Sequence, residues 1–312
     1  MFIVKNSRSI EKLKNLFNKF FLKSKQILYK FYINNVKDYL ILSSSPFISG
    51  DTFKLISNHV YEKNNEFNYK LVKERELIFI KSEYFFDFMN KNYKLLPRNL
   101  IIISHNSDLN FEFDVETKFN LKDKNINLFL QNLNIEIKQD SNIHLLPIGF
   151  ENRNWFKNGK ISVLKKKYSL KNKLDRIYCS FNISTNVERV KLLNSLDKNN
   201  VTDYFRRTNH RFFIQTLSKY KICVCPPGNG IDTHRIWESL LVETLPIVLE
   251  SDFSKNLKNL GIPIHIVKNW SELEKINENV ISKLYSSYSD DLKNKEFLNI
   301  DYWNNKFNEI IS

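Results

Sequence analysis

The sequence predicts an α/β protein with two units, each built on a parallel β-sheet that is flanked by helices. Short apolar runs of four or five residues alternate with helical stretches, which is typical of a parallel sheet buried on both faces. A polar and basic stretch from residue 151 to residue 173 separates two such series. The length of 312 residues also suits two domains of about 150 residues each. We therefore expect one domain over residues 1–150 and a second over residues 151–312.

The composition is that of a globular protein with a sizeable core, because 42% of the residues are hydrophobic and 26% are charged. The net charge of +14 has two interpretations. One is an anionic partner, such as nucleic acid, lipid or a phosphorylated substrate. The other, which we favour, is a compositional bias toward lysine and asparagine. The three cysteines form neither a disulfide framework nor a metal-ligand spacing, which indicates a reducing compartment.

A basic helix is predicted over residues 10–31, within a basic segment 1–31, because apolar residues recur there at helical spacing among lysines. This helix either lies on an anionic membrane or docks on the protein with a solvated lysine face, and we favour docking. The sequence has no run of 18 apolar residues, and no signal peptide is expected, because the apolar stretch at residues 2–4 is short and is followed by charge. We therefore expect a cytoplasmic protein without a membrane span, at the inner face of a membrane if the basic helix binds lipid.

Within the first unit, apolar runs predict strands at residues 39–42, 77–80 and 100–104, with further short elements at 126–133 and 143–146. A helix follows the first strand and runs from Gly50 through His59. Polar residues that include Asp51 and the stretch His105 to Asp108 fall at strand ends, where parallel sheets bind ligands. The alternating acidic residues 112–116 are interpreted as the solvent face of a strand or loop rather than as a metal site.

The second unit repeats the pattern. Strands are predicted at residues 176–181, 221–225, 246–249 and 262–267, and helices at 187–196, 270–288 and 301–311. A further helix carries the apolar face Ile236, Trp237, Leu240 and Leu241, and begins after a cap at Asp232 or Thr233. Two of the six glycines, Gly228 and Gly230, lie in the loop before that helix. A glycine loop before a helix start suits an anion, because the backbone can approach it and free N–H groups face it.

Several short motifs together resemble one enzyme family. They are residues 105–108, residues 147–149, residues 181–182 with Thr185, Asn186 and Arg189, residues 226–235 with Trp237 and Glu238, and residues 246–248. The segment DTHRIWE, from Asp232 to Glu238, is the most specific of them. Over roughly residues 100–270 these motifs resemble the exostosin-like branch of the GT-B glycosyltransferases.

The resemblance implies two Rossmann-like domains that face each other across a cleft, with the last helix able to pack back on the first domain. The C-terminal domain would bind a nucleotide-sugar, and the N-terminal domain a glycan or lipid-linked acceptor whose hydroxyl receives the sugar. Such enzymes need no metal for catalysis, and the sequence has no Asp-x-Asp motif, so no metal or other cofactor is expected. Loop N–H groups, a helix dipole and a guanidinium would hold the diphosphate instead.

The resemblance also implies roles for single residues. Gly228 and Gly230 would let the backbone approach the pyrophosphate, and Arg235 would stabilise the nucleoside diphosphate as it leaves. Glu238 would accept hydrogen bonds from ribose hydroxyls. Asp232 is either the helix cap, which we favour, or a ligand to donor hydroxyls. The remaining candidate donor ligands are Ser180, Asn182, Thr185, Asn186, Asn229 and His234, of which His234 either faces the donor or lies exposed beside the loop.

The chain departs from the family pattern at two positions. Gly230 stands where many retaining members carry a second glutamate, which favours inversion, and inversion needs a general base on the acceptor side. Asp108 is our first candidate for that base, followed by His105 and Asp51. His105 could instead contact donor phosphate, and Asp51 could cap its helix. Glu243 stands where the family has a glycine, so the helix end must accept a left-handed residue or be built differently.

An alternative interpretation is that the protein is not an enzyme but a basic α/β module that binds glycan or nucleic acid. Nucleic acid is not expected, because the sequence matches no helix-turn-helix, zinc finger or RNA-recognition motif. A thermal-shift screen with nucleotides and nucleotide-sugars distinguishes a transferase from a binding module, since only the transferase requires a nucleotide site.

Overall fold

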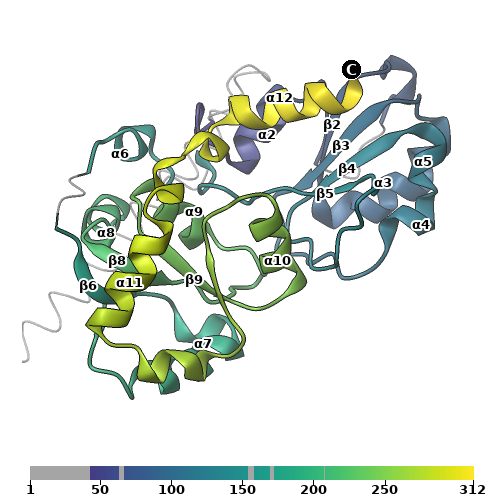
Figure 1. Cartoon of the computed structure of the whole chain (residues 1–312). Coiled ribbons are helices and arrows are strands. Elements are labelled where there is room, and N and C mark those ends of the chain that lie inside the picture. The colour runs from purple at the N-terminus through teal and green to yellow at the C-terminus, as the bar shows by residue number, and fades with distance from the viewer. Residues whose placement is uncertain (1–42, 63–66, 154–157, 169–171, 207) are drawn as a thin grey trace, which may run out of the picture.

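The computed structural model describes residues 43–312, except 63–66, 154–157, 169–171 and 207. It contains two five-stranded sheets, each parallel between all neighbouring strands and flanked by helices (Figure 1). The predicted fold class is therefore confirmed. The helix predicted at residues 10–31 and the strand predicted at residues 39–42 lie outside the described residues. Within the described part of the chain, no helix combines the length and apolar character needed to cross a bilayer.

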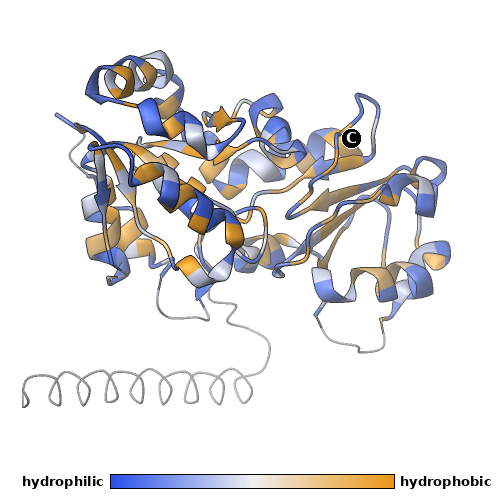
Figure 2. Ribbon diagram, turned by 90° about the horizontal axis from the view of Figure 1, so that it is seen from below, coloured by the Kyte–Doolittle hydropathy of each residue, from blue (hydrophilic) through white to orange (hydrophobic). Residues whose placement is uncertain are grey.

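The first sheet has its strands in chain order, β1-β2-β3-β4-β5. The strands are β1 (His59–Tyr61), β2 (Leu77–Lys81), β3 (Leu100–His105), β4 (Ile126–Leu130) and β5 (Ile143–Leu145). The helices of this part are α2 (Gly50–Ile56), α3 (Phe85–Asn92), α4 (Val115–Phe119) and α5 (Leu121–Lys124). All residues of β3 and β4 are buried, as the continuous apolar runs predict. Figure 2 shows these apolar strands between helices with polar outer faces.

The second sheet has the order β7-β6-β8-β9-β10. Its strands are β6 (Leu174–Cys179), β7 (Thr202–Tyr204), β8 (Tyr220–Val224), β9 (Leu245–Leu249) and β10 (His265–Val267). The helices are α6 (Ile161–Leu164), α7 (Val187–Leu196), α8 (His210–Leu217), α9 (His234–Leu241), α10 (Asp252–Asn259) and α11 (Glu278–Tyr288). In chain order this is the doubly wound arrangement 2-1-3-4-5, which reverses direction between β6 and β8. Such a reversal opens a crevice at the carboxyl ends of the two strands, where ligands bind.

The last helix, α12 (Ile300–Ile311), returns to the first sheet. Figure 1 shows it crossing from the second unit toward α2. The Phe307 ring meets Phe129 of β4 with centroids 4.7 Å apart, and Trp303 meets Phe53 of α2 at 6.4 Å. The apolar face of α12 is therefore buried on the N-terminal part of the chain.

The structure differs from the sequence expectations at several elements. The helix predicted from Gly50 through His59 ends at Ile56, and His59 begins β1. Strands β1 and β7 are edge strands with partly exposed residues, so they lack the apolar run that predicts a buried strand. Of the two alternatives for the acidic residues 112–116, the loop is found for Glu112 and Asp114, which are exposed and in no strand. Glu116 lies in α4, which Asp114 caps by accepting a hydrogen bond from the Thr117 backbone N–H. The predicted helix 270–288 is divided into a 3₁₀ segment, Trp270–Lys275, and α11, which Asn277 caps.

Candidate functional site

A cavity of about 460 Å³ lies at the carboxyl end of the first sheet, within the usual size range of small-molecule sites. Side chains from α2, from the ends of β2, β3 and β4, and from the start of α9 line it. They include the three predicted catalytic candidates, Asp51, His105 and Asp108. The other lining residues are Lys54, Glu62, Lys81, Glu83, Asn106, Ser107, Gln131, Ile148, Asn152 and His234. The convergence of parallel strand ends thus gathers residues that are far apart in the sequence.

His105 is the last residue of β3 and is buried. Its Nε2 lies 3.1 Å from the Pro147 carbonyl, and the Asn106 backbone N–H donates to its Nδ1 at 2.7 Å. Burial lowers the pKa of His105 to about 4, so the ring is neutral near pH 7. Both ring nitrogens are engaged, which fixes the ring in the cavity wall.

The two aspartates take different positions. Asp51 lies in the first turn of α2 but does not cap it, because Ser49 occupies the N-cap and accepts from the Thr52 N–H. Asp51 instead accepts a hydrogen bond from the backbone N–H of Arg153 at 3.0 Å. Asp108 is exposed, and its carboxylate accepts from the Asn229 side-chain amide at 3.1 Å. Asp108 therefore touches the loop that belongs to the second unit.

The two lysines of the cavity are already paired. Lys54 lies 2.5 Å from Glu62, and Lys81 lies 2.5 Å from Glu83. Each ammonium group is thus neutralised by a neighbouring carboxylate, and an incoming anion would have to compete with it. Amides, hydroxyls and carboxylates are the groups that the cavity offers to a ligand, and these suit the hydroxyls of a sugar.

A turn at residues 147–149 connects this cavity to the second unit. The Ile148 N–H donates to the Asp232 carboxylate at 2.7 Å, and the Gly149 carbonyl accepts from His234 Nδ1 at 2.7 Å. Gly149 has a φ of +64°, and a Cβ on it would lie 2.4 Å from the Ile48 carbonyl oxygen. Only glycine fits this position, so the turn holds its carbonyl in a fixed direction.

Asp232 is not the helix cap that we favoured. Thr233 occupies the N-cap of α9, without a side-chain hydrogen bond, and the Asp232 carboxylate also accepts from the Trp237 indole N–H at 2.9 Å. Burial raises the pKa of Asp232 to about 7, against the opposing effect of these donors. Asp232 therefore joins the two units from a buried position.

The loop at residues 226–233 packs closely on the first unit. The Asp232 backbone N–H donates to Asn132, and the Ile231 N–H donates to Asn110. A Cβ on Gly230 would lie 2.6 Å from the Asn132 side-chain nitrogen. The contact between the units therefore explains why glycine stands at position 230, independently of any ligand.

Two arginines lie beside the crevice between β6 and β8. Arg235 donates to the Ser180 carbonyl, and its guanidinium lies 4.8 Å from the centroid of the Phe213 ring. Arg189 donates to the carbonyls of Pro227 and Asn182, at 2.9 and 2.8 Å. Burial and then the charge of Arg235 lower the pKa of Arg189, which indicates that the two cations lie close together.

Neither arginine forms an ion pair with a carboxylate among the described residues. Arg189 appears in the motif but was not predicted as a site residue. Its position in the first turn of α7, directly after the polar turn at residues 182–186, was the signal that could have identified it.

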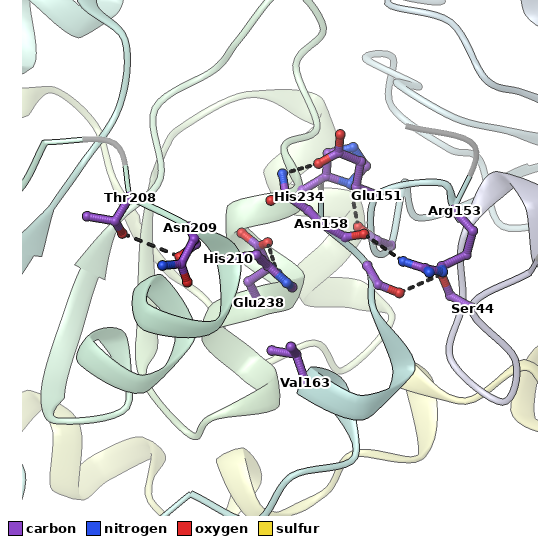
Figure 3. A network of polar contacts seen from close by, with 12 residues as sticks. Ser44, Glu151, Arg153, Asn158, Val163, Thr208, Asn209, His210, His234 and Glu238 are labelled. Carbon is purple, nitrogen blue, oxygen red and sulfur yellow. Dashed lines mark hydrogen bonds and ion pairs between the residues drawn. The ribbon is translucent and has the colours of Figure 1, made fainter. Parts of the chain in front are cut away.

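The remaining donor candidates lie around these arginines. Asn186 donates to the Gly228 carbonyl at 2.8 Å, while Asn182 and Thr185 bound the short 3₁₀ turn after β6. Glu238 is buried, and its carboxylate lies 3.0 Å from Nε2 of the buried His210 (Figure 3). His210 was not predicted, because no spacing in the sequence links α8 to α9. Among the described residues, no group of three or more His, Cys, Asp or Glu is arranged to hold a metal ion.

No protein-family model matches this chain, and no curated protein sequence does. Among solved structures the chain is similar to apo OtsA, with a TM-score of 0.46 and 10% identity over 78% of this chain and 74% of that one. It is also similar to TarM, with a TM-score of 0.44 and 11% identity over 78% of this chain, and it spans only 56% of the TarM chain.

A third similar structure is T4 phage BGT in complex with UDP-glucose, with a TM-score of 0.36 and 13% identity over 80% of this chain and 88% of that one. All three TM-scores are below 0.5, so the function is argued below from the residues of this chain.

Proposed function

We propose that this protein is a GT-B glycosyltransferase of the exostosin-like type. It transfers a sugar from a nucleotide-sugar donor to a hydroxyl of a glycan or lipid-linked acceptor. The observation that carries the proposal is the pair of arginines at the reversal point of the second sheet, across the interface from a polar cavity in the first. A crevice with two cations suits a diphosphate, and the cavity suits a hydroxyl-bearing acceptor.

In this proposal the donor diphosphate lies between the glycine loop, the start of α9 and the two arginines. Arg235 and Arg189 exchange their carbonyl partners for phosphate oxygens, and their charges stabilise the nucleoside diphosphate as the bond to the sugar breaks. Glu238 accepts hydrogen bonds from the ribose, and protein groups alone balance the phosphate charge. Ser180, Asn182, Thr185, Asn186 and Asn229 complete the donor side.

The acceptor lies in the cavity, where a base removes the proton from the attacking hydroxyl. Gly230 stands where a second glutamate would support retention, so inversion is proposed. The candidate bases from the sequence, Asp108, His105 and Asp51, all line that cavity.

A thermal-shift screen with UDP, GDP, dTDP, CMP and their sugars tests the proposal. At least one nucleotide is expected to raise the melting temperature, and Arg235→Ala should abolish that rise. Arg211→Ala is the matched control, because Arg211 is an exposed arginine of α8 and should leave the rise unchanged. If no nucleotide stabilises the wild-type protein, the transferase proposal is wrong. If nucleotide binds but no sugar is transferred or hydrolysed, the protein is a binding module.

A further inference from the structure

His234 is held by a hydrogen bond that determines its tautomer. Its Nδ1 lies 2.7 Å from the Gly149 carbonyl, and a carbonyl oxygen only accepts hydrogen bonds. Nδ1 therefore carries a hydrogen, and in the neutral imidazole Nε2 keeps its lone pair. Within the described part of the chain, Nε2 makes no hydrogen bond. Because His234 lines the cavity, the structure supplies an imidazole base at the wall where the acceptor is proposed to bind.

The carbonyl that orients His234 is itself fixed. Gly149 adopts a left-handed conformation in which a Cβ would meet the Ile48 carbonyl, and the Phe150 N–H donates to that same carbonyl at 2.9 Å. One residue earlier, the Ile148 N–H donates to Asp232. A histidine whose second nitrogen donates to a fixed oxygen has both its tautomer and its ring orientation set, which is the arrangement that a general base needs.

We propose that His234 is the general base that deprotonates the acceptor hydroxyl, an inference that rests on the proposed transferase function. His105 cannot take this role, because both its nitrogens are engaged with Pro147 and Asn106. Asp108 is exposed and accepts a hydrogen bond from Asn229. Carboxylates are ordinarily much weaker bases than imidazole, which changes its charge between pH 5 and 8.

The proposed step balances in atoms and charge. The proton of the acceptor hydroxyl passes to Nε2 of His234, and the acceptor oxygen forms a bond to the anomeric carbon of the donor sugar. The bond from that carbon to the diphosphate oxygen breaks, and its electron pair leaves with the nucleoside diphosphate beside Arg235 and Arg189. The imidazolium then releases its proton to solvent.

His234→Asn is the sharpest test, because the asparagine amide can still donate to the Gly149 carbonyl while the basic nitrogen is gone. The assay measures release of nucleoside diphosphate from the nucleotide-sugar that stabilises the protein most, with water as the acceptor. We expect kcat to fall about 10²- to 10⁴-fold, the usual contribution of a general base, while the nucleotide-induced rise in melting temperature stays unchanged.

Asp108→Asn and Asp51→Asn test the two carboxylates that are the other candidates for the general base. A larger loss of kcat in His234→Asn than in either of them supports the proposal, and a larger loss in either of them overturns it. Loss of nucleotide binding in His234→Asn also overturns it, because His234 would then be a donor ligand. If the wild type neither binds nor hydrolyses any nucleotide-sugar, the transferase function itself has failed.

A pH profile separates a base from a structural residue. Protonation of Nε2 removes its lone pair, so wild-type kcat/KM should fall on the acid side, and His234→Asn should lose that dependence. The titratable and charged groups that line the cavity together with His234 are Asp51, Asp108, His105 and the two lysine–glutamate pairs. Burial raises the pKa of Asp232, two residues before His234, to about 7, so Asp232→Asn is measured as well. An acid limb that vanishes in Asp232→Asn but persists in His234→Asn contradicts the proposal.

Discussion

The strand ends of the two sheets differ in how their cations are satisfied. At the first sheet, Lys54 and Lys81 each have a glutamate partner at 2.5 Å. At the second, Arg189 and Arg235 have carbonyl and aromatic partners only, among the described residues. Carbonyl groups neutralise no charge, so the second site gains much more from an anionic ligand than the first.

The strand orders explain why the two sites differ in position as well. The first sheet has its described strands in chain order, so no reversal opens a crevice between neighbouring strands. Its cavity is instead closed by α2 and by the start of α9 from the other unit. The second sheet reverses between β6 and β8, and its arginines lie at that reversal. In the proposed reaction, the second sheet therefore supplies the site for the leaving anion, and the first supplies the site for proton transfer and hydroxyl recognition.

The largest effect on the free energy of unfolding is expected at Asp232, whose carboxylate accepts hydrogen bonds from Ile148 of the first unit and Trp237 of the second. Burial raises its pKa from the usual 3.8 to about 7, so the folded state keeps a proton that the unfolded state releases between about pH 4 and 7. This residue should therefore make the free energy of unfolding fall as pH rises through that window, by at most roughly 4 kcal/mol, and have no further effect above it.

Denaturation of wild type and Asp232→Asn between pH 4 and 8 measures this difference. The excess stability of the wild type over the variant should shrink with pH and level off near pH 7. An excess that grows with pH would mean that the Ile148 and Trp237 donors keep the carboxylate charged.

The second prediction tests whether the diphosphate binds at the arginines of the second sheet rather than at the paired lysines of the first. Arg189→Ala should weaken nucleotide binding roughly 10- to 150-fold, because a charge-assisted hydrogen bond contributes about 1.5–3 kcal/mol. Lys54→Ala should change the affinity by less than about threefold, because Lys54 already has its anion partner in Glu62. Titration calorimetry with the best nucleotide from the screen compares the two variants. If Lys54→Ala has the larger effect, the diphosphate binds in the first cavity and the comparison is wrong.

Much of this fold follows from the sequence, because buried parallel strands and amphipathic helices leave local patterns. The bounds of α7 match the prediction, and β2 and β3 each extend only one residue beyond their apolar runs. The gathering of Asp51, His105 and Asp108 in one cavity also follows, because the carboxyl ends of parallel strands converge.

The features of the site that the sequence did not predict depend on contacts between segments that are distant in the chain. The pairing of His210 with Glu238 joins two helices, and the fit of Gly230 against Asn132 joins the two units. Neither contact leaves a period or a spacing in the sequence. The tautomer of His234 likewise depends on the Gly149 carbonyl, 85 residues away in the chain.

The third prediction concerns the close contact between Gly230 of the second unit and Asn132 of the first. Gly230→Ala should destabilise the protein by about 1–3 kcal/mol, because its Cβ would lie 2.6 Å from the Asn132 amide. Gly228→Ala is the matched control, since its Cβ would lie 3.2 Å from the flexible tip of Arg189 and at an ordinary contact distance of 3.8 Å from the Gly230 carbonyl oxygen. Chemical denaturation measures both. Asn132→Ala should cost less stability in the Gly230→Ala background than in the wild type, because the clash ends while the hydrogen bond from the Asp232 N–H is lost in both backgrounds. Equal destabilisation by the two glycine variants would contradict a specific contact at Gly230.

The smallest effect is expected at Glu243, which lies before the amino end of β9, at the opposite end of the sheet from the proposed donor site. Glu243 has a φ of +55°, and such a conformation costs a non-glycine residue roughly 1–2 kcal/mol. Glycine would remove that cost, but it would also lose the ion pair with Lys295, worth about 0–1 kcal/mol, and add about 0.4–1 kcal/mol of unfolded-state entropy. These contributions nearly cancel, so Glu243→Gly should change the free energy of unfolding by less than about 1 kcal/mol, and Lys295→Ala isolates the ion-pair part.

Nucleotide affinity should not change in either variant, because the strain lies at the end of the sheet away from Arg189 and Arg235. A loss of affinity in Glu243→Gly would show that the two ends of α9 are coupled, and that the donor site is not confined to the carboxyl edge of the second sheet.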